Sequence, residues 1–185
     1  MILYRCFAWN QAAPDDGPDA PLGFPTAFQG EGRHDNPAVY GCVYLADRTI
    51  SCLVEQLAAF RGQRLSASVL QRRGLPLALA ALDLDDRAGL IDLDDPATLR
   101  RERLRPSRVA TRERSITQPQ ALDLHQRYPD AAGLRWWSSW EALWTNVTVF
   151  DRATHALRVV DVRALTLDDP AVQEAAAHFG LRIVP

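Results

Sequence analysis

Residues 40–60 read YGCVYLADRTISCLVEQLAAF, and this stretch sets the local plan of the chain. From Tyr40 to Ala46 the residues are small, apolar or aromatic, a pattern typical of a buried strand. After Asp47, apolar residues recur at helical spacing, namely at Ile50, Leu53, Val54, Leu57 and Ala58. A strand that leads directly into a helix is therefore the first building block of the expected fold.

The sequence on either side continues to alternate between strand-like and helix-like segments. Further strands are predicted at Ile2 to Ala8, Leu75 to Leu84, Gly133 to Trp137, Asn146 to Phe150 and His155 to Val162. Residues Asn10 to Pro25 are rich in Pro, Gly and Asp, which predicts a loop. The mixture of strands and helices indicates an α+β fold in a single domain over residues 1–185.

Capping signals predict two more helices. One runs from Thr117 to Tyr128 with Thr117 as its N-cap, and the other from Ala171 to Phe179, between Asp169-Pro170 and Gly180. The sequence Leu-Asp-Asp-Pro-Ala occurs at 93–97 and 167–171, and a shared Asp-Pro helix start explains it better than duplication. Acidic groups at 83–86 and 92–95 lack calcium-loop spacing, so we interpret them as solvated turns and caps and expect no metal site.

Four tryptophans, Trp136, Trp137, Trp140 and Trp144, lie at the end of the Gly133 strand and just after it. Trp137, Trp140 and Trp144 are spaced at i, i+3 and i+7, which predicts a helical turn that presses one aromatic face into the core. The alternative is a platform on which the rings of a ligand stack.

Composition restricts the class of protein. A chain of 185 residues with 47% hydrophobic and 24% charged residues is typical of a soluble domain. It contains no apolar run of the roughly 20 residues that a membrane span needs, and its start lacks a secretory signal. We expect a cytoplasmic location. Cys6, Cys42 and Cys52 lack metal-site spacing and are expected as buried free thiols.

The charged residues restrict the kinds of ligand that the chain can bind. The net charge of -2 argues against direct, nonspecific binding of nucleic acid. All 21 basic residues are arginine, so a phosphate site would have to use guanidinium groups or backbone amides.

Five polar residues are the candidates for a site. Arg33 follows Gly30-Glu31-Gly32, where glycines let the backbone approach a ligand and the guanidinium can grip a pyrophosphate. Tyr44 lies at the end of its strand, and Glu55 lies within the helix that follows it. Ser138 ends the Gly-Leu-Arg-Trp-Trp-Ser segment, and Asn146 stands eight residues later.

These residues, in this order and spacing, resemble the RES-domain family over nearly the whole chain. Gly32-Arg33, Val43-Tyr44 with Glu55 eleven residues on, and Ser138 with Asn146 to Phe150 carry the resemblance. It implies an ADP-ribosyltransferase-like split β-sheet core flanked by helices, similar to toxins of the diphtheria type. It also implies NAD+ degradation by phosphorolysis or hydrolysis, with an Xre-type antitoxin protein as partner. The family roles fall on Arg33, Tyr44, Glu55 and Ser138.

The chemistry of NAD+ suits such a set, with NAD+ as substrate, phosphate as an optional co-substrate and no bound cofactor. Nicotinamide departs as a neutral base, so no acid is needed, while positive charge develops on the ribose. We expect Glu55 to stabilise that charge, Arg33 to neutralise the pyrophosphate and Tyr44 to stack on or bond to the nicotinamide end. Ser138 would orient the ribose or amide, and Asn146 would support the site.

Two alternatives stay open at this point. The same site could transfer ADP-ribose to a macromolecule, or the chain could be a non-catalytic module that stacks nucleic-acid bases on arginine and tryptophan. The sequence leaves open the acceptor, NAD+ against NADP+, and whether two copies form a homodimer.

Overall fold

The computed structural model describes residues 1–184 and divides into two compact units. The first unit comprises residues 24–45 and 84–157 together with Met1. The second comprises residues 2–23, 46–83 and 158–184. The chain passes from one unit to the other more than once, so neither unit is a continuous stretch of sequence.

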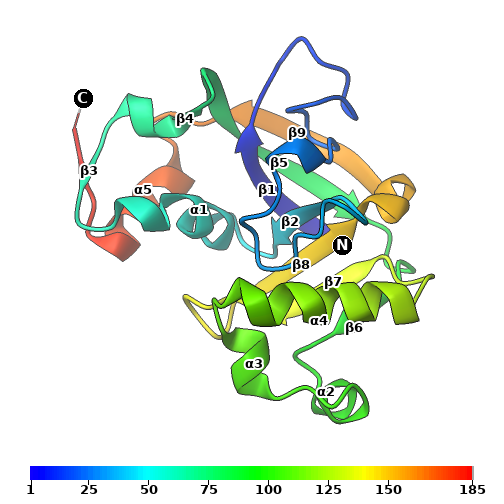
Figure 1. The fold of residues 1–185 in the computed structure, drawn as a ribbon. Coiled ribbons are helices and arrows are strands. Elements are labelled where there is room, and N and C mark those ends of the chain that lie inside the picture. The colour runs from blue at the N-terminus through cyan, green and yellow to red at the C-terminus, as the bar shows by residue number, and fades with distance from the viewer. Residues whose placement is uncertain (185) are drawn as a thin grey trace. The chain divides into compact units, whose positions relative to one another are not determined.

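The strands of the first unit run in the order β2-β8-β7-β6 (Figure 1). Their bounds are β2 Cys42–Ala46, whose last residue belongs to the second unit, β6 Leu90–Asp92, β7 Gly133–Trp137 and β8 Thr145–Phe150. β6 pairs with β7 in parallel, whereas β7 pairs with β8 antiparallel, so Trp136 lies opposite Asn146. The helices are α2 Pro96–Arg101, α3 Pro106–Ala110 and α4 Arg114–Arg127, and short 3-10 turns lie at Thr26–Phe28 and Asp151–Ala156.

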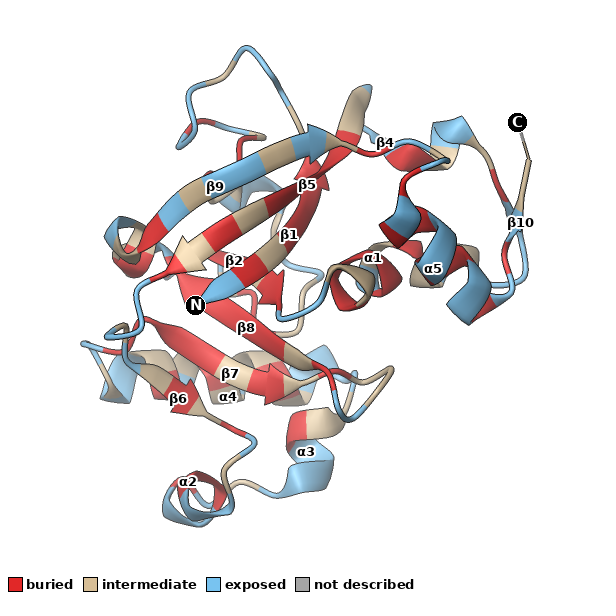
Figure 2. Cartoon of the chain, turned by 180° about the vertical axis from the view of Figure 1, so that it is seen from behind, coloured by how far each residue is buried: buried red, intermediate tan, exposed pale blue. Residues whose placement is uncertain are grey.

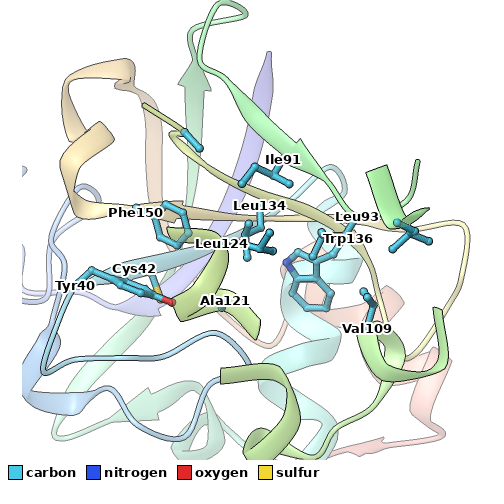
Figure 3. Packing of buried hydrophobic residues seen from close by; sticks show 12 residues of the cluster. Tyr40, Cys42, Ile91, Leu93, Val109, Ala121, Leu124, Leu134, Trp136 and Phe150 are labelled. Carbon is cyan, nitrogen blue, oxygen red and sulfur yellow. The ribbon is translucent and has the colours of Figure 1, made fainter. Parts of the chain in front are cut away.

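The core of the first unit lies between α4 and one face of these strands. Ala121 and Leu124 of α4 point toward Leu134, Trp136 and Phe150, as Figure 3 shows. Leu124 is 1% exposed and Leu134 and Phe150 are fully buried. Each such side chain contributes about 1.5–3 kcal/mol by leaving water, which fixes the strand face that also carries the candidate site residues.

In the second unit, β5 pairs with β1, β4 and β9. β1 spans Ile2–Ala8, β4 Gln71–Arg72, β5 Leu75–Leu84 and β9 Leu157–Ala164. Figure 2 shows buried residues concentrated on β1 and β5, while β9 carries many exposed ones. Helices α1 Thr49–Leu57 and α5 Pro170–Phe179 pack together. Strand β3 Arg64–Leu65 pairs with β10 Arg182–Ile183. Short 3-10 turns lie at Ala58–Phe60 and Ala67–Leu70.

Local chemistry explains the bounds of α5. The Asp169 side chain accepts a hydrogen bond from the Ala171 backbone N–H at 2.9 Å, and Pro170 occupies the first turn. Gly180 ends the helix with a φ of 63°, a left-handed conformation that costs little only for glycine. Asp95 and Pro96 begin α2 in the same way.

Arg5 fixes the end of the irregular segment 10–25. This arginine is 7% exposed, and its guanidinium donates to the backbone carbonyls of Ala20, Pro21 and Gly23 at 3.2, 2.5 and 2.8 Å. A loop that composition predicts as irregular is therefore pinned to β1 by one buried cation.

The α+β class, with sheets flanked by helices, is confirmed, and two local predictions are wrong. α4 begins at Arg114, so Thr117 lies inside the helix rather than at its cap. The tryptophan spacing does not mark a helical turn, because β7 ends at Trp137 and residues 138–144 form a loop to β8. The expectation of a single domain stays a prediction. Among residues 1–184, no helix combines the length and apolarity needed to cross a membrane.

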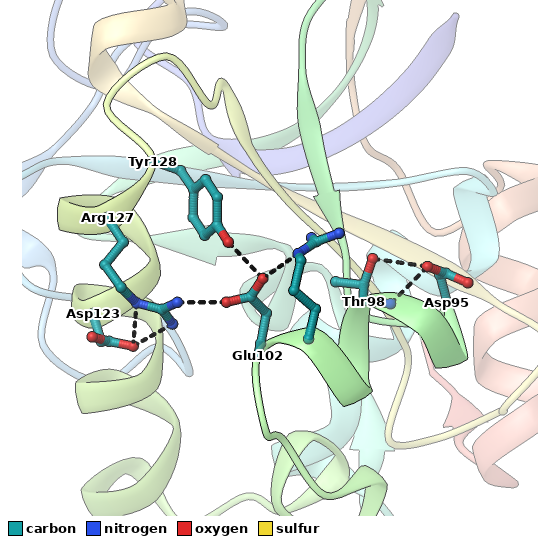
Figure 4. A network of polar contacts seen from close by, with 7 residues as sticks. Asp95, Thr98, Glu102, Asp123, Arg127 and Tyr128 are labelled. Atoms are coloured by element: carbon teal, nitrogen blue, oxygen red, sulfur yellow. Dashed lines mark hydrogen bonds and ion pairs between the residues drawn. The ribbon is translucent and has the colours of Figure 1, made fainter.

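Glu102, just after α2, is the buried centre of a polar network in the first unit (Figure 4). Its carboxylate accepts hydrogen bonds from Arg101, Arg127 and Tyr128, each at 2.6 Å. Burial acts to raise the pKa of Glu102, but these hydrogen bonds together hold it below its ordinary value. The network ties the 101–102 turn to the end of α4.

We predict that Glu102→Gln lowers the free energy of unfolding by about 2 kcal/mol, because it leaves two arginines facing a neutral amide. Urea unfolding followed by circular dichroism measures the change. Glu113→Gln, which alters an exposed glutamate of the same unit, should stay within about 0.5 kcal/mol of wild type. Equal midpoints for the two variants would contradict this role of Glu102.

Candidate functional site

The Gly30–Asp35 loop is held by a buried carboxylate, that of Asp35. This side chain accepts hydrogen bonds from the backbone N–H groups of Gly30 and Gly32, both at 2.7 Å. It also accepts from the Tyr44 hydroxyl at 2.7 Å and from the Cys42 thiol at 3.4 Å. One carboxylate therefore fixes the shape of the loop and ties it to β2.

Tyr44 completes this anchor from the strand side. Its hydroxyl donates to Asp35 and accepts from the backbone N–H of His34 at 2.8 Å. Burial raises the pKa of Tyr44 well above its ordinary value, and the neighbouring Cys42 and Asp35 raise it further. The hydroxyl thus stays protonated at neutral pH, and it is engaged with the loop.

His34 is the buried histidine of this loop and is 3% exposed. Its Nδ1 lies 2.8 Å from the Thr148 hydroxyl of β8, which also accepts from the Trp136 indole N–H at 3.1 Å. Burial, with a smaller contribution from Arg33, lowers the pKa of His34 to about 3, so the ring is neutral at pH 7. A neutral imidazole here joins the loop to both β7 and β8.

Arg33 is positioned by contacts to Trp136, Val109 and Thr117. Its guanidinium carbon lies 4.5 Å from the centre of the Trp136 ring, and Nη1 donates to the Val109 carbonyl at the end of α3 at 2.5 Å. The Arg33 carbonyl accepts from the Thr117 hydroxyl at 2.7 Å. These contacts orient the guanidinium, a group whose planar N–H donors suit anionic oxygens.

Helix α4 holds the rest of the loop. The Gln118 side-chain amide donates to the carbonyls of Gly30 and Gly32, both at 2.9 Å. Gln118 and Thr117 thus attach the arginine loop to α4 by hydrogen bonds to its backbone carbonyls.

Ser138 directly follows β7 and Asn146 lies in β8, and they are 2% and 3% exposed. The Ser138 hydroxyl accepts from the Trp140 backbone N–H at 3.1 Å, and the Ser138 backbone N–H donates to the Trp144 carbonyl at 2.8 Å. Asn146 lies opposite Trp136, whose ring packs under Arg33. The first unit therefore connects Arg33, Tyr44 and the β7–β8 pair through direct contacts.

Glu55 lies on α1 in the second unit, and it is exposed. Its assignment to the site stays a prediction from the sequence.

Sequence analysis missed the residues that shape this site. His34 and Asp35 follow Arg33 directly in the sequence, but their burial and their partners are seen only in the folded chain. The sequence pattern predicts core packing or a stacking platform for Trp136 and a strand for Thr148, but not their contacts to Arg33 and His34. Among residues 1–184, no group of three or more His, Cys, Asp or Glu side chains could hold a metal ion, and all three cysteines are buried and free.

These features define an α+β protein with an arginine-bearing loop suited to an anionic ligand. The RES domain model matches residues 2–170. The chain belongs to the RES-domain family.

The fold is also similar to a solved structure. A chain from the crystal structure of the M. tuberculosis MbcT–MbcA toxin–antitoxin complex superposes with a TM-score of 0.67 at 20% identity. The similarity covers 95% of this chain and 88% of that one. Among curated proteins, none matches the sequence significantly.

We predict that Gly32→Ala lowers stability and disorders the Arg33 loop, because a Cβ on Gly32 would overlap the Tyr44 hydroxyl and the Asp35 carboxylate. Gly89→Ala is the matched control, since a Cβ there meets only the Asp130 carbonyl, at 4.0 Å. We expect a loss of about 1–3 kcal/mol for Gly32→Ala in chemical unfolding and little change for the control. Equal stabilities would show that the loop can shift to admit the methyl group.

Proposed function

We propose that this RES-domain protein cleaves the nicotinamide N-glycosidic bond of NAD+, with phosphate or water as acceptor, and acts as the toxin of a toxin–antitoxin pair. The observation that carries the proposal is the Arg33 loop, found in a chain that the RES model covers from residue 2 to 170. The guanidinium of Arg33 is oriented by the Trp136 ring and the Val109 carbonyl.

Arg33 binds the pyrophosphate in this proposal. A guanidinium offers two parallel N–H groups to phosphate oxygens, and charge-assisted bonds of this kind are about twice as strong as neutral ones. The chain has no lysine, so this task falls to arginine or to backbone amides. Because Asp35 fixes Gly30 and Gly32, the loop is shaped before the ligand arrives, which reduces the ordering cost of binding.

Glu55 stabilises the reacting ribose in this proposal. Nicotinamide leaves as a neutral base, so the reaction needs no general acid at the leaving group. The C1′–N bond breaks, its electron pair goes to the pyridine ring, and positive charge develops on the ribose. A carboxylate beside that charge lowers the barrier because the charge is larger in the transition state than in the substrate. The role is assigned from the sequence pattern.

Tyr44 and the β7–β8 residues have supporting roles. The Tyr44 hydroxyl is engaged by Asp35 and His34, so we assign it to positioning the loop and leave its ring to contact the nicotinamide end. Ser138 follows the strand that carries Trp136, and Asn146 lies opposite Trp136 on β8, where both would hydrogen-bond the ribose or the carboxamide.

An antitoxin partner is the second half of the proposal. It is supported by the RES family and by a fold like that of a chain in the MbcT–MbcA complex. An Xre-type antitoxin is what the family resemblance implies for this chain, and a cytoplasmic location would follow from that role.

Incubating purified protein with NAD+, with and without phosphate, and following nicotinamide release tests the enzymatic proposal. We expect Glu55→Gln to lower kcat by about 10²–10³-fold with a small change in KM, because its charge acts at the transition state. Glu174→Gln, an exposed helix glutamate of the same unit, should keep wild-type kinetics. Wild-type protein that releases no more nicotinamide than Glu55→Gln would end the proposal, and label from NAD+ on a macromolecule would redirect it to ADP-ribosyl transfer.

Arg33→Ala should raise KM by about tenfold or more and change kcat less, because Arg33 binds the pyrophosphate in substrate and transition state alike. Arg135→Ala, which removes a half-exposed arginine of β7 paired with Asp92, is the control for loss of charge. Melting temperatures of both variants check the fold. A drop in kcat with unchanged KM for Arg33→Ala would reverse the assigned role.

A further inference from the structure

The segment 100–114, RRERLRPSRVATRER, concentrates positive charge on an acidic protein. It holds seven of the 21 arginines and two glutamates, which gives the segment a net charge of +5. Because the whole chain has a net charge of -2, the other residues together carry -7. The segment runs from the end of α2 through α3 to the start of α4, all within the first unit.

Much of this charge is not neutralised within the protein. All seven arginines are exposed. Arg101 pairs with Glu102 and Arg114 with Glu31, but Arg103, Arg105 and Arg108 make no ion pair with any residue from 1 to 184. Glu102 is buried and shared with Arg127, so it offsets little of the surface charge.

Arg112 joins this segment to the loop between β7 and β8. Its guanidinium carbon lies 3.8 Å from the centre of the Trp140 ring, and Nε donates to the Ser139 hydroxyl at 3.3 Å. The same loop exposes 83% of Leu143, the most exposed large apolar residue of the described chain. Arginine, tryptophan and an exposed aliphatic side chain together are typical of protein-binding surfaces rather than of solvated charge.

We infer that Arg105, Arg108, Arg112, Trp140 and Leu143 form a docking surface for an acidic, partly apolar segment of a protein partner. Carboxylates pair bidentately with guanidinium groups, and the aromatic and aliphatic side chains add apolar contact. A nucleic acid fits less well, because its phosphates would extend beyond this small basic area. The residues outside the segment carry a net charge of -7, which would repel them. The inference deepens the proposed function, since an antitoxin is the partner which that function requires.

The docking surface adjoins the candidate site through α3. Val109, one residue from Arg108, accepts the Arg33 hydrogen bond, and Ser139 follows Ser138. A partner held here lies beside the arginine loop without replacing any residue assigned to binding or cleaving NAD+.

Fluorescence anisotropy with a labelled peptide of repeating Glu-Leu-Glu-Ala, in the absence of NAD+, tests the inference. The same peptide with Gln in place of Glu, and a labelled oligothymidine, are the comparison probes. Arg105→Gln/Arg108→Gln is the test variant, and Arg61→Gln/Arg64→Gln removes the same charge from exposed positions of the second unit. We expect the test variant to bind the Glu peptide about tenfold more weakly than wild type, and the control to match wild type.

The inference is overturned if wild type fails to bind the Glu peptide, binds the Gln peptide equally well, or prefers oligothymidine. It is also overturned if both double variants bind like wild type. Should the test variant melt early, the salt dependence of wild-type binding decides, because an ionic surface must lose affinity as salt rises. Nicotinamide release by Arg105→Gln/Arg108→Gln should match wild type, so failure of the docking surface and failure of the enzymatic proposal give different results.

Discussion

The site depends on the Asp35 carboxylate more than on any other group. It accepts hydrogen bonds from two backbone N–H groups of the glycine loop, from the Tyr44 hydroxyl and from the Cys42 thiol. A buried carboxylate must have such donors, since burying a charge without them costs several kcal/mol. The fold supplies the donors only when the loop and β2 take up the observed arrangement. The hydrogen bonds to Asp35 therefore both stabilise the fold and fix the geometry of the loop that would bind the ligand.

Around this anchor, two layers converge on Arg33. From the strand side, Trp136 supports its guanidinium and shares Thr148 with His34. From the helix side, Thr117 and Val109 hold its backbone and side chain. An arginine that samples many rotamers in water is thus fixed by packing, which lowers the entropy lost when an anion binds. The same contacts bring the basic segment 100–114 next to the loop.

Local signals carried most of the fold prediction. β1, β5 and β7 match the expected strands, and Asp169, Pro170 and Gly180 bound α5 as capping chemistry requires. Errors arose where a local pattern had another cause. Helix α4 extends three residues before Thr117 although Pro119 lies inside it, and the spacing of Trp137, Trp140 and Trp144 arises in a loop. Asp35 could not be found from spacing, because its partners meet only after folding. Glu55 is still a prediction.

His34 makes the first unit sensitive to acid. Its folded pKa of about 3 lies below the roughly 6.5 of an unfolded histidine, so between these values only the unfolded chain takes up the proton. The histidine therefore contributes its full stability above about pH 6.5, and that contribution falls by up to about 1.4 kcal/mol for each pH unit below it. Mild acidification would therefore weaken the contact of His34 with Thr148, which joins the arginine loop to β8. The charge of Arg33 itself would not change.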